Sequence, residues 1–448
     1  MNKNWKIIII VILIRFSLSA QEKTWQLKEC IAYALEHNLQ VNDFEFNEQS
    51  GRESYRQSIR SLLPNIDAAT TYFINYGRST DPFTNDIVTT DFFSNTYNIN
   101  LSIDVFQGFQ KINNIKASKF LYSALKEDNQ QQKYLLAFRI MQAFYDIQFF
   151  EGLTRISKEQ LAVSQSNYNL VQKQLELGLK AGADLYEAES QLLTDKLNVT
   201  QAENQLEASK LRLIQEMNLK NANDIAIQTE IILEDSVSEG GNIEIDTIFN
   251  KAKDFLPLIK SQQYREKAAK KQLDVARGSL YPSLSFFAGI GTGYFETTSN
   301  DIGETISFRD QFRDNTFQFI GVSLSIPISN GWANRSQVQQ QKIEYQRAQN
   351  DLDVQEQELY RTIQALVQDY NSLLVEVEQS KQKIKSQSLA FTIAQKRYEK
   401  GLISTIELFT AKNLLTSAQN ENLQIQLRSQ INKSTLDFYR GLPIFNMN

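Results

Sequence analysis

One cysteine, one histidine, 6 prolines and 17 glycines are all that this 448-residue sequence contains of those four residue types. The single cysteine, Cys30, excludes an intrachain disulfide framework. The single histidine, His37, leaves no histidine cluster for a metal site or a catalytic triad. We interpret both as ordinary helix residues. The scarcity of proline and glycine suits long uninterrupted elements and argues against low-complexity disorder.

The sequence also lacks the signatures of an enzyme. It has no phosphate-binding glycine-rich loop, no plausible catalytic triad and no ligand cluster with metal-site spacing. The formal charge is -5 and the pI is near 5.4, without a strongly basic segment, so nucleic acid is not an expected partner. With 4 methionines, a copper or silver relay is not expected. We predict no catalytic site, no cofactor and no bound metal.

Long apolar runs are absent after residue 20. Before it, two lysines precede an apolar run, and small residues follow: Lys3, Lys6, Ile7 to Ile14, Ser17, Ser19 and Ala20. This pattern predicts a signal peptide over residues 1–20, with a short anchored or buried helix as the alternative. Leu27-Lys28-Glu29 lacks the small residues expected before a lipidated cysteine, so we expect export without lipid attachment. Membrane insertion of the mature chain would then require β-strands.

The sequence contains two copies of one pattern. Three pairs of residues mark them, the first offset by 218 residues and the others by 223: Pro64 and Pro282, Gly108 and Gly331, Gly178 and Gly401. We place the repeats at 21–220 and 244–442, separated by a linker over 221–243 and followed by a tail over 443–448. In each copy 70 steps separate the two glycines, which as helix would give a rod about 105 Å long.

Each copy begins with a helical pattern, over residues 25–63 and 245–280, and continues with two alternating segments. We predict strand pairs at 65–76 with 96–106 and at 283–295 with 316–327, each joined by a long polar loop. Each segment has the length of a tilted transmembrane strand. A soluble half-buried sheet would show the same alternation and remains an alternative.

The segment 96–106 shows the alternation most clearly. Tyr97, Ile99 and Leu101 lie on an apolar face, which we predict to contact lipid. The other face, predicted to line a lumen, carries Asn98, Asn100, Ser102 and Asp104. Aromatic residues near the loop ends predict a membrane girdle: Tyr72, Tyr76, Tyr97, Tyr294, Phe317 and Phe319.

Four strands cannot close a barrel, since the smallest closed barrels have about eight. The chain must therefore share its sheet with copies of itself. Two copies would give a packed interior and three would leave space for a channel. The strand pattern alone does not select between them.

The helical parts carry seven-residue repeats, which are typical of helices that coil around neighbours. We predict long helices at 109–178 and 331–400, followed by helices at 182–217 and 404–440. In the second copy the repeat comprises Ile363, Tyr370, Val377, Ile384, Phe391 and Tyr398. The accompanying seam becomes small and polar toward Gly401, and the outer faces are polar. A tube with a water-filled bore fits this pattern, and a solid coiled-coil stalk is the alternative.

The order of elements resembles the TolC-type outer-membrane efflux proteins across essentially the whole mature chain. Five local motifs carry the resemblance: Leu27-x-x-x-Ile31-x-x-Ala34-Leu35-x-x-Asn38, Ser61-Leu62-Leu63-Pro64, Ser279-Leu280-Tyr281-Pro282, Arg397-Tyr398-x-x-Gly401 and Gly441-Leu442. The resemblance implies a mixed α and β fold in which a four-stranded contribution to a shared transmembrane β-barrel joins a periplasmic α-barrel. It also implies a homotrimer in the outer membrane that spans into the periplasm and works with a periplasmic adaptor and an inner-membrane RND or ABC transporter.

The implied function is the outer-membrane channel of a tripartite efflux or type I secretion system, giving substrates a passive exit. A periplasmic coiled-coil scaffold with a soluble β-module is the alternative. The resemblance places adaptor contacts at the tip turns, Gly178 with Leu179 and Gly401 with Leu402. The first tip departs from the pattern, because Gln174-Leu175-x-x-Gly178 replaces the aromatic-containing turn of the second.

The resemblance also implies an acidic gate at the periplasmic entrance. Glu407 matches an acidic position of the constricted mouth, and Asp184, with Glu187 nearby, is its counterpart in the first copy. The second acidic position of the family is Thr410 here. A capping interpretation competes with the gate, since Ser404-x-x-Glu407 is a capping box.

Overall fold

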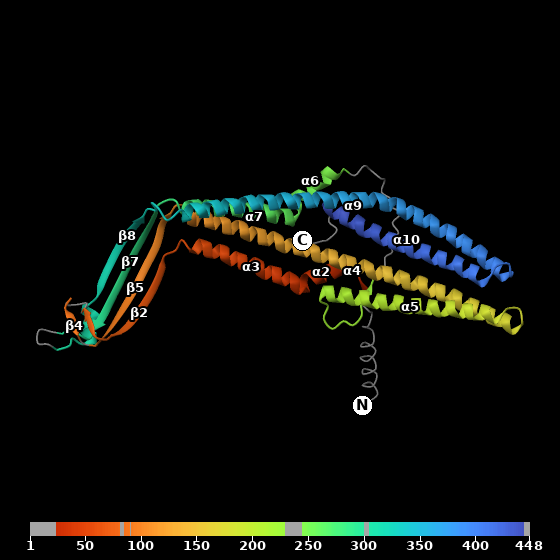
Figure 1. The fold of residues 1–448 in the computed structure, drawn as a ribbon, viewed down its shortest axis with the longest axis horizontal. Helices are drawn as coiled ribbons and strands as arrows, with labels where there is room; N and C mark the ends of the chain where they lie inside the picture. The colour runs from red at the N-terminus through yellow and green to blue at the C-terminus, as the bar shows by residue number, and fades with distance from the viewer. Residues whose placement is uncertain (1–23, 81–84, 90, 229–243, 300–303, 443–448) are drawn as a thin grey trace, which may run out of the picture. The chain divides into compact units, whose positions relative to one another are not determined.

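The computed structural model describes residues 24–80, 85–89, 91–228, 244–299 and 304–442 (Figure 1). The predicted signal peptide, the tail and most of the predicted linker lie outside the described residues. The helices are α2 (Leu27–His37), α3 (Leu39–Arg60), α4 (Gln110–Glu176), α5 (Gly182–Met217), α6 (Ile245–Phe255), α7 (Pro257–Gly278), α8 (Phe308–Asp314), α9 (Ala333–Glu399) and α10 (Thr405–Tyr439). The strands are β1 (Thr24–Trp25), β2 (Asn65–Asn75), β3 (Arg78–Thr80), β4 (Ile87–Thr89), β5 (Phe92–Gln107), β6 (Ala226–Ile227), β7 (Ser283–Phe295) and β8 (Phe317–Ser325).

The chain divides into two compact units, and each unit takes segments from both copies. The sheet unit comprises residues 46–127 and 260–354, and the helical unit comprises residues 1–45, 128–259 and 355–448. The predicted mixed α and β class is therefore confirmed.

The sheet unit is built on one antiparallel four-stranded sheet, in the order β2-β5-β7-β8 (Figure 1). Its register places the predicted lumen residues Asn98 and Asn100 opposite Gly291 and Gly289 of β7. Leu101 lies opposite Ala288 on the other face. A shift in register between Asp104 and Phe106 marks a bulge near the end of β5. Strands β2 and β8 form the two edges of the sheet.

The two copies are equivalent in detail within this unit. Lys111 Nζ donates to the Ser61 carbonyl at 2.9 Å, and Asn334 Nδ2, 223 residues later, donates to the Ser279 carbonyl at 2.9 Å. The chain enters both long helices through two successive residues of positive φ, Gly108-Phe109 and Gly331-Trp332. The β2·β5 and β7·β8 registers also correspond. The pair Ile66↔Leu101 becomes Leu284↔Leu324 when 218 is added to the first residue number and 223 to the second. The duplication therefore extends to the strand register.

Two helices predicted as continuous are each broken. Asn38 separates α2 from α3 because its Oδ1 accepts hydrogen bonds from the backbone N–H groups of Gln40, at 2.9 Å, and Val41, at 3.3 Å. Leu256 separates α6 from α7 because a residue before proline, here Pro257, disfavours helical backbone. Both breaks divide the first helical segment of a copy into a short and a longer helix.

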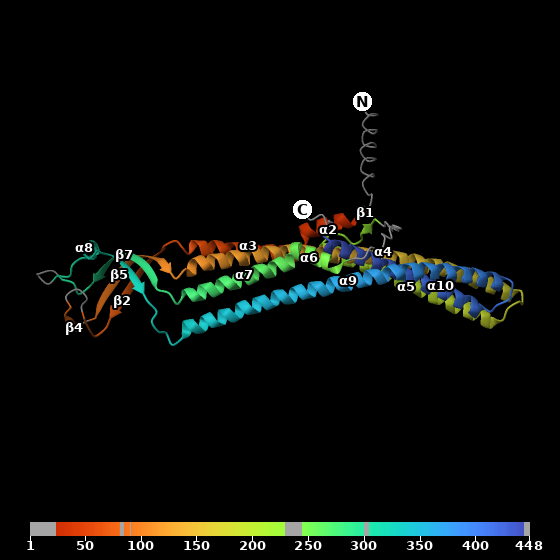
Figure 2. The same ribbon diagram turned by 90° about the horizontal axis from the view of Figure 1, so that it is seen from above.

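The long loops between paired strands contain structure that the sequence pattern did not predict. Strands β3 and β4 form a small antiparallel pair, and α8 lies beside the end of β7 (Figure 2). Gln311 of α8 accepts a hydrogen bond from the Phe295 N–H and donates to the Phe295 carbonyl, both at 3.0 Å. The helix therefore covers the end of β7, beyond Gly291, which is the last residue of β7 that pairs with β8.

The helical unit contains two helix pairs, α4 with α5 and α9 with α10 (Figure 1). Ion pairs hold them together: Lys158 with Glu203 at 2.8 Å in the first, and Lys383 with Glu421 at 2.5 Å in the second. The α4 and α9 helices are each 67 residues long, as equal spacing between the marker glycines predicts. Among the described residues, no helix is both long enough and apolar enough to cross a lipid bilayer.

Candidate functional site

The two tip turns have the same backbone. Gly178 and Gly401 have φ values of 75° and 71°, in the left-handed region that favours glycine. The N–H of Leu179 donates to the Gln174 carbonyl at 2.8 Å, and the N–H of Leu402 donates to the Arg397 carbonyl at 2.9 Å. These bonds, with those of the glycine N–H groups, make two Schellman motifs. They leave the side chains of Leu179 and Leu402 70% and 64% exposed, at equivalent positions of the two copies.

Two of the three predicted gate carboxylates, Asp184 and Glu407, turn back onto the N-terminus of their own helix. Glu407 Oε1 accepts from the Ser404 N–H at 3.5 Å, and the Glu407 N–H donates to Ser404 Oγ at 3.2 Å, so the capping box is complete. Asp184 Oδ2 accepts from the Ala181 N–H at 3.2 Å; alanine has no side-chain oxygen, and the Asp184 N–H donates instead to the Ala181 carbonyl at 3.1 Å. Lys180 lies 3.7 Å from Asp184 Oδ1. The capping role of both residues is therefore present in the structure.

The structure does not bring the gate residues into contact with each other. Among the described residues, no hydrogen bond or ion pair joins Asp184, Glu187 and Glu407, and Glu187 is half-buried on α5. A role at a shared opening would therefore require an assembly of several chains in which these residues surround the entrance.

Directly behind the tips, the four helices α4, α5, α9 and α10 contribute to one apolar cluster. We call it the tip cluster, and it consists of Val171, Ala188, Tyr398, Ile403, Leu408 and Phe409. Tyr398 is 5% exposed, and its hydroxyl lies 3.3 Å from Thr405 Oγ1. The aromatic residue of the second turn therefore packs inside the unit.

A buried ion pair lies close to the tip cluster, and the sequence pattern did not reveal it. Lys412 of α10 is 1% exposed, and its ammonium contacts the carboxylate of Asp195 on α5. Lys412 Nζ also donates to Ser164 Oγ of α4 at 2.5 Å, and Ser164 Oγ donates to the Asp195 carboxylate. Gln191 Nε2 donates to Asp195 Oδ1 at 3.1 Å. We call Lys412, Asp195 and Ser164 the ion-pair node.

Its environment affects the lysine. Burial lowers the pKa of the Lys412 ammonium, and the hydrogen bond and charge of Asp195 oppose that shift. The Phe409 ring lies 6.0 Å from the ammonium. A signal was present in the sequence, because Lys412 continues the buried stripe of Thr405, Leu408 and Leu415 at helical spacing.

The predicted lumen residues share one face of the sheet. Asn100 Nδ2 donates to Asp67 Oδ2 of β2 at 3.2 Å, and Asp104 pairs with Lys111 at 2.9 Å. Ser102 lies opposite Phe287 of β7. Asn98 lies against Gly291, where a Cβ atom would collide with its side-chain oxygen. The four residues therefore line a single polar strip.

Two residues of the predicted girdle lie on that polar face as well. The Phe319 ring covers Gly289 and the Phe317 ring covers Gly291, since an added Cβ would lie 2.5 and 2.6 Å from their Cζ atoms. Phe287 covers Gly321 in the same way. The interpretation of Phe317 and Phe319 as lipid-facing girdle residues is therefore wrong for this register, because they stand on the face of Asn98. Glycines opposite leave room for the rings to lie over the backbone.

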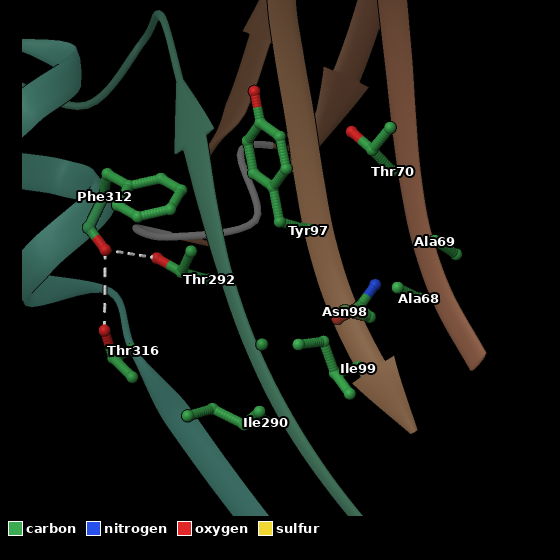
Figure 3. A pocket seen from close by; sticks show the side chains of 11 residues that line it. Ala68, Ala69, Thr70, Tyr97, Asn98, Ile99, Ile290, Thr292, Phe312 and Thr316 are labelled. Carbon is green, nitrogen blue, oxygen red and sulfur yellow. Dashed lines mark hydrogen bonds between the residues drawn. The ribbon is translucent and has the colours of Figure 1, made fainter. Parts of the chain in front are cut away.

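One cavity of about 460 Å³ lies on the apolar face, beside α8 (Figure 3). Ile99, Ile290 and Phe312 give it an apolar lining, and Thr292 Oγ1 donates to the Phe312 carbonyl at 2.7 Å. Of the predicted site residues it includes Asn98 alone. Within the described residues, no group of three or more histidine, cysteine, aspartate or glutamate side chains could hold a metal ion.

The chain is similar to known proteins over nearly its whole length. The model of the family "Outer membrane efflux protein" matches residues 30–219 and 249–442, one range in each copy. The cation efflux system protein CusC of Escherichia coli O157:H7 is 20% identical over 411 residues, which cover 92% of this chain and 85% of that protein. The probable efflux pump outer membrane protein TtgC of Pseudomonas putida is 20% identical over 440 residues, covering 95% and 86%.

Solved structures share the fold. CusC superposes with a TM-score of 0.78 at 19% identity, covering 95% of this chain and 96% of that one. The outer membrane channel CmeC of Campylobacter jejuni gives a TM-score of 0.79 at 16% identity, covering 93% and 85%. Because the family match includes both copies of the repeat, the chain belongs to the outer membrane efflux protein family and is an outer-membrane efflux channel.

Proposed function

We propose that three copies of the chain form one exit duct, which a periplasmic adaptor joins to an inner-membrane RND or ABC transporter. The observation that carries this proposal is the pair of free sheet edges. On β8, Ile320, Val322 and Leu324 are 75%, 65% and 62% exposed. A long apolar edge strand is a template for pairing with another chain, and closure into a barrel removes the edge.

The duplication supplies the register of that pairing. Inside the chain, β5 of the first copy pairs with β7 of the second, with Leu101 opposite Ala288 and Ile99 opposite Ile290. Adding 223 to the residue numbers of β5 gives those of β8, and subtracting 218 from those of β7 gives those of β2. The contact inside the chain is thereby converted into β8 against β2 of a partner subunit. Leu324 then lies opposite Thr70 of the partner subunit, and Val322 opposite Tyr72 of the partner subunit. The same shift relates the β2·β5 and β7·β8 registers, which supports its use here.

The polar face supports three copies rather than two. Two copies would close eight strands around a packed interior, whereas three would close twelve and leave a wet lumen. Asn98, Asn100, Ser102 and Asp104 suit a wet lumen, because a packed interior without hydrogen-bond partners would leave such groups unsatisfied.

The tip turns are the proposed adaptor contacts. Leu179 and Leu402 stand exposed at equivalent positions, so a trimer would present six similar apolar points next to Gly178 and Gly401. The two tips differ behind these leucines, where Tyr398 of the second copy packs into the tip cluster and Leu175 takes its place in the first. Asp184, Glu187 and Glu407 are the proposed acidic entrance. The relatives named for efflux pumps and efflux systems support this assembly.

Cysteine cross-linking tests the proposal. Two consecutive pairs are introduced separately, Val322→Cys with Tyr72→Cys and Ser323→Cys with Thr71→Cys, since one of two consecutive antiparallel pairs is a non-hydrogen-bonded pair with closer side chains. We expect one of them to yield a covalent trimer under mild oxidation, and the protein to conduct ions in planar bilayers. Cys30 is buried and serves as the internal control.

The matched control is Val322→Cys with Phe73→Cys, which shifts the register by one residue and places the two side chains on opposite faces. Cross-linking of the control as efficient as that of the predicted pairs would contradict the register. A monomeric, non-conducting product would contradict the channel assembly itself.

A further inference from the structure

One row of residues across the sheet combines a carboxylate, an amide and an aromatic ring on the face predicted to line the lumen. Asp67 of β2 lies opposite Asn100 of β5, and Asn100 lies opposite Gly289 of β7. Phe319 of β8 lies opposite Gly289 and completes the row. Residues directly opposite each other in an antiparallel sheet share a face, so these four positions form one line across it. We call them the acid–ring row.

The ring of Phe319 lies over the backbone of β7. A Cβ atom placed on Gly289 would lie 2.5 Å from Cζ of the ring and 3.1 Å from Asn100 Oδ1, so the ring and the amide meet above the glycine. Phe319 is nevertheless 42% exposed. A ring held in this way is a platform on which a flat aromatic group or a cation can stack.

Further phenylalanines extend the platform on the same face. Phe287 and Phe317 lie over glycines of the neighbouring strand in the same way. The ring centroids of Phe287 and Phe319 are 6.1 Å apart. In the register proposed for β8 against β2, Phe73 of the partner subunit lies opposite Gly321, so the aromatic patch continues across the subunit boundary.

Asp67 gives the row a negative charge that no cation offsets. Its carboxylate accepts a hydrogen bond from Asn100 Nδ2 at 3.2 Å, and within the part of the chain that the structure describes no cationic side chain pairs with it. By contrast, Asp104 on the same face is paired with Lys111 at 2.9 Å. The row therefore attracts cations at the end opposite its ring.

The row has the dimensions of a flat molecule of a few fused rings. Three strand spacings separate the backbones of Asp67 and Phe319, about 14 Å in total. The Phe319 ring shortens this span because it leans over Gly289. Between the two ends, Asn100 donates to Asp67 through Nδ2, which leaves Oδ1 to accept a hydrogen bond from an amino group of the ligand.

We propose that the acid–ring row, with Phe287 and Phe317 beside it, is a binding site for flat aromatic cations that pass through the lumen. The aromatic plane stacks on Phe319 and the positive charge lies toward Asp67. This proposal rests on the proposed trimeric channel and adds a class of substrate to it. A ring over a glycine also supports strand pairing, so the test separates binding from assembly.

Block of the bilayer current by ethidium, a flat aromatic cation, tests the proposal. Ethidium is added to the full-length protein on the side of the strand loops, and the sodium current without ethidium shows whether each variant is assembled. We expect saturable block of the wild-type channel. Phe317→Leu with Phe319→Leu keeps apolar cover over both glycines but removes the rings, so the half-blocking concentration should rise about tenfold. Phe317→Tyr with Phe319→Tyr restores the rings and should restore the block.

Phe286→Leu is the matched control, because Phe286 lies opposite Val322 on the other face of β7 and should not affect the block. Asp67→Asn keeps an oxygen for the Asn100 amide but removes the charge. It should weaken block by ethidium at low salt and leave block by phenanthridine, the uncharged parent ring, unchanged. The proposal would be overturned by a wild-type channel that ethidium does not block, by an unchanged block in the leucine double variant or in Asp67→Asn, or by an equal loss in Phe286→Leu.

The two proposals fail differently. If wild-type protein conducts and the β8–β2 cysteine pairs form a covalent trimer, but ethidium does not block, the channel assembly stands and the cation site is wrong. If neither conduction nor the β8–β2 link is found, the assembly is wrong and the cation site falls with it.

Discussion

The two copies of the repeat keep the same backbone at their turns and differ in the side chains that meet another copy. Gly108 packs against Gly278, while nothing lies within 4 Å of a Cβ placed on its counterpart Gly331. Lys412 is buried with Asp195, while its counterpart Glu189 is half-buried on α5. One junction between copies is thus satisfied inside the chain and the other is left open for a neighbour.

The largest expected difference lies between Lys412 and Glu189. Lys412→Ala leaves Asp195 buried without its cation, which typically costs about 3–5 kcal/mol. Glu189→Ala changes a helix surface and should stay within about 0.5 kcal/mol. Thermal unfolding followed by circular dichroism at 222 nm would measure both.

An apolar replacement of the pair provides the control for that experiment. Lys412→Met with Asp195→Leu removes both charges together, and such replacements are often neutral or stabilising. Destabilisation by the double variant as large as that of Lys412→Ala would show that packing volume, rather than the unpaired charge, dominates.

The two faces of the sheet should differ by a similar but smaller amount. On a barrel, an arginine at mid-depth on the lipid face costs about 2–4 kcal/mol, whereas lumen positions accept charge. Leu101→Arg should therefore reduce the yield of heat-sensitive trimer, and Ser102→Arg should mainly change conductance. Equal losses of trimer would mean that the assignment of faces is wrong.

Most of the fold prediction came from the periodicity of the sequence and from the positions of its glycines and prolines. The strands follow from alternation, and the long helices follow from the heptads and the marker glycines. Helix α5 and strand β7 have the predicted bounds, 182–217 and 283–295. The breaks at Asn38 and Leu256 required local chemistry, an amide cap in one case and Pro257 in the other. Helix α8 was missed because its contacts are with β7, through Gln311, rather than within a periodic segment.

The candidate site was predictable only in part. The caps at Glu407 and Asp184 are encoded within four residues of the helix start, where sequence patterns are informative. The ion-pair node joins residues 217 and 248 positions apart in sequence, and a single sequence contains no signal that pairs them. Likewise, Phe317 and Phe319 were assigned to the girdle by their nearness to a loop, whereas the alternation along β8 places them on the face of Gly321, as the register shows.

The turn glycines offer a third comparison. Alanine in the left-handed region costs about 1–2 kcal/mol at either position. At Gly108 the added Cβ would also fall on the Gly278 carbonyl oxygen, so Gly108→Ala should lower the melting temperature of the chain more than Gly331→Ala. In the proposed trimer, however, Gly331 faces Arg60 of the partner subunit. Gly331→Ala should therefore impair trimer formation, and normal assembly of that variant would contradict the proposed contact of Gly331 with the partner subunit.

The smallest change in stability, but a distinct functional effect, is expected at the entrance carboxylates. Asp184→Asn with Glu407→Gln keeps an oxygen that can accept the Ala181 and Ser404 backbone hydrogen bonds. The interaction of the charges with the helix N-termini is lost, about 0.3–1 kcal/mol at each, together with the ion pair between Lys180 and Asp184. The trimer should therefore remain, while six carboxylates disappear from its proposed opening and cation selectivity falls.

Measurements at two salt concentrations distinguish the gating role of these carboxylates from their capping role. The screening length is about 30 Å at 0.01 M salt and about 3 Å at 1 M, so a charge effect on ions in the bore should be large at the lower concentration and small at the higher. Reversal potentials in bilayers at both concentrations measure it. Glu187→Gln is the control, because that carboxylate makes no cap and should reduce selectivity alone, without a change in melting temperature. Unchanged selectivity of the double variant at low salt, together with a lower melting temperature, would leave Asp184 and Glu407 with the capping role only.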